Sequence, residues 1–241
     1  MLIAQITDIH AAPDNDNLAR LSRAMAWLNA FKPDLLVVTG DLVDEGWQAG
    51  YEAVAAALRR APCRVLLLPG NADNRQAMRN RWQETMRWKQ GALHFSEVIN
   101  GTPVIGLDTT LEGETRGDIT PHLGWLAATL AGRSRPALIF THHPLFRCGI
   151  APIDDVMCGG EAAFWQMIAD NPVAPLAVCS GHAHRSISRV INGIPAYLCG
   201  SVCPANPLLL DASRIPPVTD APALMIYDLR NGYLVASQVS V

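Results

Sequence analysis

Histidine and aspartate residues recur in short polar motifs along the chain, each directly after a run of apolar residues. The motifs, in chain order, are Asp8-Ile9-His10, Gly40-Asp41, Gly70-Asn71-Ala72-Asp73, His142-His143-Pro144 and Gly181-His182-Ala183-His184. In an extended segment, side chains two residues apart project from the same face about 6.6 Å apart. The Asp-x-His and His-x-His pairs can therefore converge on one ion, and the glycines allow a close approach of the backbone to a ligand.

Each motif alone has a simpler interpretation. A single Asp-x-His at a strand end is more often a cap or a turn, and Gly-Asp and Gly-Asn are common turn pairs. The Gly-His-x-His motif alone is equally consistent with a turn and with a metal site. Taken together, the motifs predict a metal site, because imidazole and carboxylate side by side suit Mn, Fe or Zn and no cluster of thiolates competes.

The apolar runs before the motifs predict strands, and several are continuously apolar, as expected for strands covered on both faces. Open α/β sheets bind ligands at the carboxyl ends of their strands, which is where all the motifs fall. The predicted strands are Leu2–Thr7, Leu35–Thr39, Arg64–Pro69, Pro103–Leu107, Ala137–Thr141, Leu176–Ser180, Ile187–Ile191, Ala196–Cys199, Ala223–Tyr227 and Tyr233–Val239.

Helical periodicity appears between these strands. Leucine and methionine residues recur at helical spacing over Leu18–Leu28, with Asp16 or Asn17 as the expected N-cap. Further helices are predicted around Ala53–Leu58, Thr120–Leu130 and Phe164–Ile168. Strand–helix alternation up to residue 150 and a strand-rich remainder predict one α/β domain over residues 1–241. The pattern leaves open whether it holds one mixed sheet or a two-sheet sandwich flanked by helices.

The composition narrows the class of partner. The 241 residues include 22 acidic and 19 basic side chains, a formal charge of −3, with 49% hydrophobic residues. Without a block of Lys or Arg, a nucleic-acid surface or a membrane surface is not expected. No stretch approaches the ~20 apolar residues of a membrane helix. The start, MLIAQITDIH, has no basic leader, so we expect a strand rather than a signal peptide, and a cytoplasmic location.

Six cysteines are scattered without Cys-x-x-Cys spacing. In a chain of this kind we expect them to be free, buried thiols rather than a disulfide framework. Cys148 and Cys158, which share one loop-like stretch, are the only pair whose spacing suggests a disulfide.

As an ordered series over residues 8–184, the five motifs resemble those of the calcineurin-like metallophosphoesterase superfamily. Within it, the chain is most similar to the bacterial cyclic-nucleotide and glycerophosphodiester phosphodiesterases. The resemblance implies an α/β fold that is a single-domain four-layer α/β/β/α sandwich of two mixed sheets flanked by helices. It also implies hydrolysis of a small-molecule phosphodiester, with specificity in the loops Cys148–Glu161 and Pro204–Pro222, and a homodimer as a candidate assembly.

The resemblance implies two divalent or trivalent transition-metal ions, with Mn or Fe preferred and Zn as an alternative. A metal-bridging hydroxide would attack the phosphorus. The implied catalytic residues are Asp41, Asn71 and His143, and His143 is expected to orient its loop rather than to bind metal. The implied ligands of one ion are Asp8, His10, Asp41 and His184, and those of the other are the shared Asp41, Asn71, His142 and His182.

Three residues outside the ligand set have simpler expectations. Asp44 could hydrogen-bond a site histidine, but a solvated loop acid is the favoured interpretation. His94 and His122 lie outside every motif and are expected to be surface or helix residues.

Ala72 is the one departure from the family pattern, which usually has histidine there as a general acid or a phosphate-stabilising group. General acid–base catalysis is worth about 10²–10⁴-fold. Either the substrate is a diester whose leaving group needs little protonation, or His143 or the Cys148–Cys158 loop supplies the function. The remaining alternative is a slow or inactive chain that acts as a binding or scaffold protein. The order of the motifs speaks against a different metal hydrolase.

Overall fold

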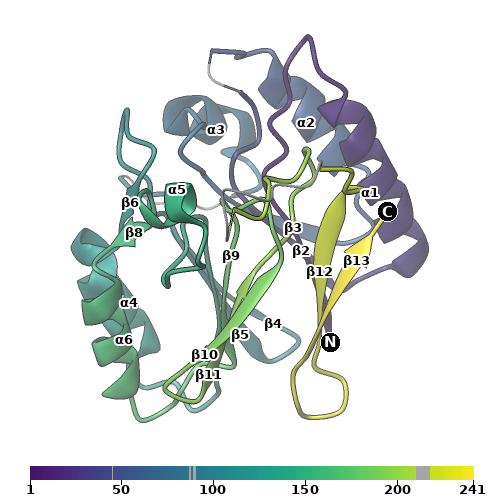
Figure 1. Cartoon of the computed structure of the whole chain (residues 1–241). Helices are drawn as coiled ribbons and strands as arrows, with labels where there is room; N and C mark the ends of the chain where they lie inside the picture. The colour runs from purple at the N-terminus through teal and green to yellow at the C-terminus, as the bar shows by residue number, and fades with distance from the viewer. Residues whose placement is uncertain (45, 87, 89–90, 210–217) are drawn as a thin grey trace.

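The computed structural model of the chain describes residues 1–44, 46–86, 88, 91–209 and 218–241. Two large β-sheets pack face to face, and helices cover their outer faces (Figure 1). The four-layer sandwich of two mixed sheets is therefore confirmed. Of the two arrangements that the sequence pattern left open, the two-sheet sandwich is the one observed.

The first sheet is mixed, with strand order β13-β12-β1-β2-β3. β1 runs parallel to β2, and β2 runs parallel to β3, whereas β1 and β12 are antiparallel, as are β12 and β13. The strand bounds are β1 Leu2–Ile6, β2 Leu35–Thr39, β3 Arg64–Leu68, β12 Ala223–Asp228 and β13 Val235–Ser240.

The second sheet has the order β10-β11-β9-β7-β5-β4. Its four central strands are parallel, and the two edge strands are antiparallel to their neighbours. The strand bounds are β4 Phe95–Ile99, β5 Thr102–Leu107, β7 Leu138–Thr141, β9 Ala177–Ser180, β10 Ile187–Ile191 and β11 Ile194–Leu198. A small separate pair joins β6, Gly117–Asp118, to β8, Cys158–Gly159.

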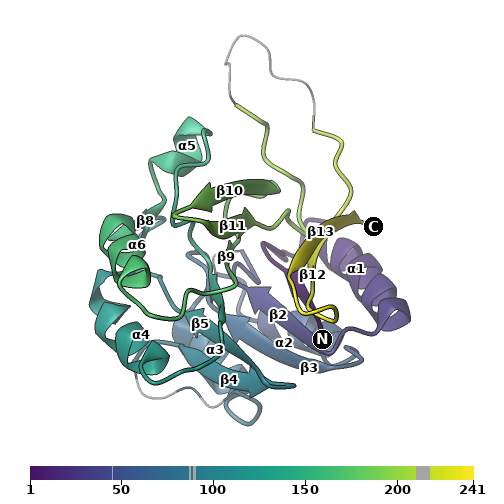
Figure 2. The same cartoon turned by 90° about the horizontal axis from the view of Figure 1, so that it is seen from below.

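Helices α1, Asn17–Phe31, α2, Gly50–Leu58, and α3, Arg75–Trp82, pack on the first sheet. Helices α4, Leu123–Leu130, and α6, Glu161–Ala169, cover the second sheet on the opposite side of the sandwich (Figure 2). A one-turn 3₁₀ helix, Thr120–His122, leads into α4, and the short α5 spans Ala151–Asp154. No helix in the described parts of the chain is long and apolar enough to cross a bilayer.

Some local predictions were incomplete. The sequence pattern missed α3, because this arginine-rich helix buries only Met78 and Trp82. Asp16 occupies the N-cap of α1 but makes no capping hydrogen bond with its side chain. β13 begins at Val235, so Tyr233 lies outside the strand predicted from it.

The six cysteines are free thiols, as predicted, and Cys148 and Cys158 are not bonded to each other. Cys63 and Cys148 are only half-buried, so the expectation of burial holds for the other four. Residues 204–209 and 218–222 form no helix or strand and extend away from the sheets (Figure 2). The central part of the predicted loop, residues 210–217, lies outside the described residues.

The Gln5 side chain joins the two sheets beneath the ends of their strands. It is fully buried, and its Nε2 donates to Thr39 Oγ1 at 2.8 Å and to the carbonyl of Ser180 in the second sheet at 3.2 Å. Its Oε1 accepts a hydrogen bond from the Tyr227 hydroxyl at 2.7 Å. A buried polar side chain is tolerated here because each end has partners.

We predict that Gln5→Leu lowers the free energy of unfolding by about 2 kcal/mol, because it leaves buried polar atoms without partners. Urea denaturation of the metal-free protein measures the change. The double variant Gln5→Leu/Tyr227→Phe should lose at least about 0.5 kcal/mol less than the sum of the two single variants. If the losses in free energy of unfolding are strictly additive, Gln5 and Tyr227 are not coupled, and the proposed hydrogen-bond network is wrong.

Candidate metal centre

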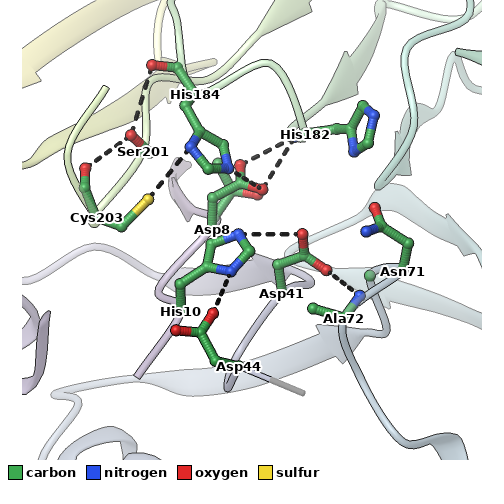
Figure 3. Close-up of polar contacts among 12 residues, drawn as sticks. Asp8, His10, Asp41, Asp44, Asn71, Ala72, His182, His184, Ser201 and Cys203 are labelled. Atoms are coloured by element: carbon green, nitrogen blue, oxygen red, sulfur yellow. Dashed lines mark hydrogen bonds and ion pairs between the residues drawn. The ribbon is translucent and has the colours of Figure 1, made fainter. Parts of the chain in front are cut away.

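The polar motifs meet at one end of the sandwich, where β1, β2, β3, β7 and β9 end. Figure 3 shows labelled residues from every motif except His142-His143-Pro144. The loops after β1 and β2 run side by side: the backbone nitrogen of Asp8 donates to the carbonyl of Gly40, and that of Ile9 to the carbonyl of Asp41. Parallel pairing of β1 with β2 therefore brings Asp8, His10 and Asp41 together, although the second motif lies about thirty residues further along the chain.

Five of the polar residues at these strand ends have left-handed backbone conformations. Asp8, His10, Asp41, His182 and His184 have φ angles between 48° and 68°. Residues other than glycine adopt this region rarely, at a cost of about 1–3 kcal/mol each. The conformation turns the chain sharply at the strand end and directs the side chains over the edge of the sheets.

Two glycines allow the loops to approach each other closely. A Cβ atom on Gly70 would lie 2.1 Å from Oδ1 of Asp41. A Cβ atom on Gly181 would lie 2.0 Å from Oγ1 of Thr7 and 3.0 Å from Oδ2 of Asp8. The glycines of these motifs are thus needed for space beside the carboxylates.

Asp8, His10, Asp41 and His184 form a first group, whose ligand atoms all lie within 4.8 Å of one another. His10 Nε2 is 3.2 Å from Asp41 Oδ2, and His184 Nε2 is 3.5 Å from Asp8 Oδ1 (Figure 3). Two imidazole nitrogens and two carboxylates are a suitable ligand set for a transition-metal ion.

A second group surrounds His142 Nε2. This atom lies 3.1 Å from Asn71 Oδ1, 3.3 Å from His182 Nδ1 and 3.4 Å from Asp41 Oδ2. The structure thus brings together all seven residues of the predicted ligand set. Asp41 Oδ2 faces both groups.

The remaining ring nitrogens of two site histidines have oxygen partners. His10 Nδ1 donates to Asp44 Oδ1 at 2.8 Å, and His142 Nδ1 donates to the carbonyl of Thr39 at 2.7 Å. These bonds fix the tautomer that leaves the Nε2 lone pair facing the site. The expectation that Asp44 is only a solvated loop acid was wrong, and the Thr39 carbonyl gave no sequence signal because any residue type carries one.

The charge distribution favours a cation at the centre. Burial alone would raise the pKa of the Asp41 carboxyl, but His142 and His10 hold it well below its ordinary value. Burial alone would lower the pKa values of His10 and His142, but the carboxylates outweigh it and raise them to about 10 and about 9. Buried carboxylates require such compensation by positive charge.

A metal ion fits this arrangement. Without a metal, the raised pKa of His142 keeps a proton on its Nε2 atom, while Nδ1 donates to Thr39. A metal ion would replace the Nε2 proton and would also be close to Oδ1 of Asn71 and Oδ2 of Asp41. Within the part of the chain that the structure describes, Nε2 of the buried His182 has no hydrogen-bond partner. Burial, together with the nearby His142, lowers the pKa of His182 to about 4, so its ring is neutral and able to bind a metal.

His143 lies beside the second group but points both ring nitrogens at other partners. Nδ1 is 2.8 Å from the hydroxyl of Thr109, and Nε2 donates to the carbonyl of Thr115 at 3.0 Å. Burial, with His142 and His182 close by, holds its pKa well below the ordinary value. The ring is neutral, and a catalytic role for it stays a prediction.

The loop after β3 is held by Asp73 and carries only a methyl group at Ala72. Asp73 accepts hydrogen bonds from the backbone nitrogens of Leu42 and Gly70, so it ties this loop to the one after β2. The backbone nitrogen of Ala72 donates to Asp41 Oδ1 at 2.8 Å. The Oδ1 atom of Asp41 therefore has its own hydrogen-bond partner, and only Oδ2 faces His10 and His142.

The two histidines outside the motifs form a separate aromatic contact. The ring centroids of His94 and His122 are 4.5 Å apart, and His94 stacks on Trp125 at 4.6 Å. His122 ends the 3₁₀ helix, as expected of a helix residue. His94 is half-buried and accepts a hydrogen bond from the backbone of Asp108, so it is not a plain surface residue.

The family model for calcineurin-like phosphoesterases matches residues 1–186 of the chain. The chain belongs to this family. The matched part contains all five motifs, and the family resemblance predicted from them is confirmed.

Two relatives of this calcineurin-like phosphoesterase come from bacteria. It is 32% identical over 190 residues to a probable cyclic nucleotide phosphodiesterase of Rhodopseudomonas palustris, a match that covers 76% of the chain and 69% of the relative. It is 27% identical over 229 residues to a probable glycerophosphodiester phosphodiesterase of Arcobacter nitrofigilis, covering 89% and 82% of the two chains. A dimetal phosphatase of Danio rerio has the same fold, with a TM-score of 0.79 at 14% identity over 100% and 96% of the chains.

We predict that Asp44→Ala weakens Mn²⁺ binding at one site about 10–100-fold, because partners behind metal-binding histidines contribute on this scale. Isothermal titration of the metal-free calcineurin-like phosphoesterase measures the affinity. Glu112→Ala, which removes an exposed carboxylate elsewhere, serves as the matched control and should bind like the wild type. Unchanged affinity in Asp44→Ala would show that its bond to His10 does not support the site.

Proposed function

We propose that the chain is a dinuclear metal-dependent hydrolase of small phosphodiesters. The observation that carries the proposal is the position of Asp41 Oδ2, 3.2 Å from His10 Nε2 and 3.4 Å from His142 Nε2. One carboxylate oxygen is thereby shared between two groups of ligand atoms. The names of the bacterial relatives support phosphodiesters as the class of substrate.

The first ion would be held by Asp8, His10, Asp41 and His184, and the second by Asp41, Asn71, His142 and His182. When bound, two such ions activate a water molecule and stabilise the charge on the phosphoryl oxygens. Mn or Fe, with Zn as an alternative, suits the mixed imidazole and carboxylate set. Asn71 contributes a neutral amide oxygen, so it removes less positive charge from the second ion than a carboxylate would.

The protein supplies positioning for this chemistry. The left-handed turns at Asp8, His10 and Asp41 fix these side chains before substrate arrives. The N–H of Ala72 donates to the Oδ1 atom of Asp41. The Oδ2 atom of Asp41 is thereby directed at His10 and His142. Such preorganisation means that little rearrangement is needed during the reaction.

Ala72 restricts the substrates that this site can use efficiently. Its methyl group cannot donate a proton to a leaving oxygen, so we propose that the enzyme favours diesters over monoesters with poor leaving groups. His143 is a poor substitute for the missing histidine, because its ring is buried and engaged at both nitrogens. Of the interpretations above, these contacts favour a leaving group that needs little protonation.

A binding or scaffold protein without catalysis has no need to keep all seven ligand residues together. The two ligand groups therefore favour an enzyme over the scaffold alternative. Cyclic nucleotides and glycerophosphodiesters are both substrates that the proposed function allows. The homodimer, the cytoplasmic location and the absence of a nucleic-acid surface stay predictions from the sequence.

We expect the chain to bind two metal ions and to hydrolyse bis(4-nitrophenyl) phosphate with Mn²⁺. Metal analysis and release of 4-nitrophenol measure the two properties. Asp41→Asn should lower kcat/KM more than about 100-fold, since changes behind the ligands alone cost about 10–100-fold. Two bound metals without diesterase activity would refute the proposed reaction and favour the scaffold alternative.

A second prediction concerns the leaving group. Ala72→His should raise hydrolysis of an alkyl phosphate monoester by up to about 10²–10⁴-fold and raise hydrolysis of bis(4-nitrophenyl) phosphate much less, because an alkoxide needs a proton to leave and 4-nitrophenolate does not. Ala72→Leu adds bulk without a proton donor and is the matched control. Equal gains on both substrates, or no gain on either, would show that Ala72 does not limit the enzyme to good leaving groups.

A further inference from the structure

The three site histidines that offer Nε2 toward a carboxylate differ in what lies behind them. His10 has the carboxylate of Asp44, and His142 has the carbonyl of Thr39. His184 has a thiol beside a backbone carbonyl: its Nδ1 lies 3.4 Å from Sγ of Cys203 (Figure 3), and the backbone of Pro204 is a second hydrogen-bond partner of this ring. Cys203 belongs to none of the motifs, lies nineteen residues further along the chain, and is only 4% exposed.

The Cys203 thiol can accept one hydrogen bond while it donates another. Its sulfur also lies 3.5 Å from the carbonyl oxygen of Pro204, to which it can donate its own hydrogen. The lone pairs of the sulfur are then free to accept the N–H of His184 Nδ1. With the proton on Nδ1, the lone pair of His184 Nε2 faces Asp8, whose Oδ1 is 3.5 Å away.

The backbone of Cys203 is itself fixed against the first ligand group. Its nitrogen donates to the carbonyl of Asp8 at 2.9 Å. Its carbonyl accepts from Ser201 Oγ at 2.8 Å and from Arg20 Nη2 at 3.2 Å. The main chain of Cys203 is therefore held against Asp8, and the sulfur reaches Nδ1 of His184 from this fixed position.

We propose that Cys203 is a positioning residue of the metal centre: it accepts the Nδ1–H of His184 and so directs Nε2 of that ring toward the ion shared with Asp8. This inference rests on the metal centre of the proposed function. Metal-binding histidines generally donate their second N–H to an outer partner, and loss of that partner typically costs about 10–100-fold in metal affinity. Neutral sulfur is a weak hydrogen-bond acceptor, and a serine hydroxyl accepts at least as well. Cys203→Ser can therefore keep the hydrogen bond from His184, whereas Cys203→Ala has no acceptor.

The test is a titration of the metal-free full chain with Co²⁺, followed by calorimetry and by absorption. Wild type should bind two ions, and Cys203→Ala should bind one of them about 10–100-fold more weakly while the other is unchanged. Cys203→Ser should recover most of the lost affinity. Cys63→Ala, which removes a half-buried thiol between α2 and β3, is the matched control and should bind like the wild type.

Thermal unfolding of the metal-free variants separates positioning from packing. The proposal expects Cys203→Ala and Cys203→Ser to melt at similar temperatures and to differ in Co²⁺ affinity. Equal affinity loss at both sites, accompanied by a lower melting temperature in both variants, would show a packing role and overturn it.

Three further outcomes would also count against the positioning role of Cys203. A near-ultraviolet thiolate-to-cobalt band in wild type that Cys203→Ser lacks would make Cys203 a direct ligand, because its sulfur lies within 4.8 Å of ligand nitrogens of His10 and His184. Wild-type affinity in Cys203→Ala would overturn the positioning role and leave the metal centre standing. Failure of the wild type to bind Co²⁺ would overturn both.

Discussion

Two buried carboxylates, Asp8 and Asp41, impose the main constraint on this structure, because each needs nearby positive charge to remain ionised away from water. Oδ2 of Asp41 lies within 3.4 Å of Nε2 atoms from both His10 and His142. The lowered pKa of Asp41 and the raised pKa of His10 have this one physical origin. The end of the sandwich is built to surround a positive charge, and a transition-metal pair fits it.

The topology explains how residues from distant parts of the chain meet there. β1 and β2 are parallel neighbours in the first sheet, and β7 and β9 are parallel neighbours in the second. Stacking of the two sheets brings the carboxyl ends of all four strands to one end of the sandwich. The buried Gln5, which bonds to Ser180 across the sheets, fixes their relative position directly below the site.

The contacts behind the histidines differ in strength as acceptors. A carboxylate lies behind His10, a backbone carbonyl behind His142 and a thiol behind His184. A stronger acceptor makes the imidazole a better electron donor to a metal, so the two proposed ions would be bound by rings of different basicity. Because Ala72 offers only a methyl group, the proposed reaction would depend more heavily on how these ligands tune the ions.

The sequence by itself predicted most of the strands and helices, from apolar runs and helical periodicity, and it placed the polar motifs at the strand ends. The set of seven ligand residues came from the family resemblance of those motifs, and the sequence pattern missed β4 and α3. It left open one sheet or two, and it favoured a solvated Asp44 over the observed hydrogen bond to His10. It did not indicate that His143 is enclosed by Thr109 and Thr115, or that Cys203 lies behind His184. Tertiary structure decided these points, because each depends on a contact between segments far apart in the chain that no local pattern encodes.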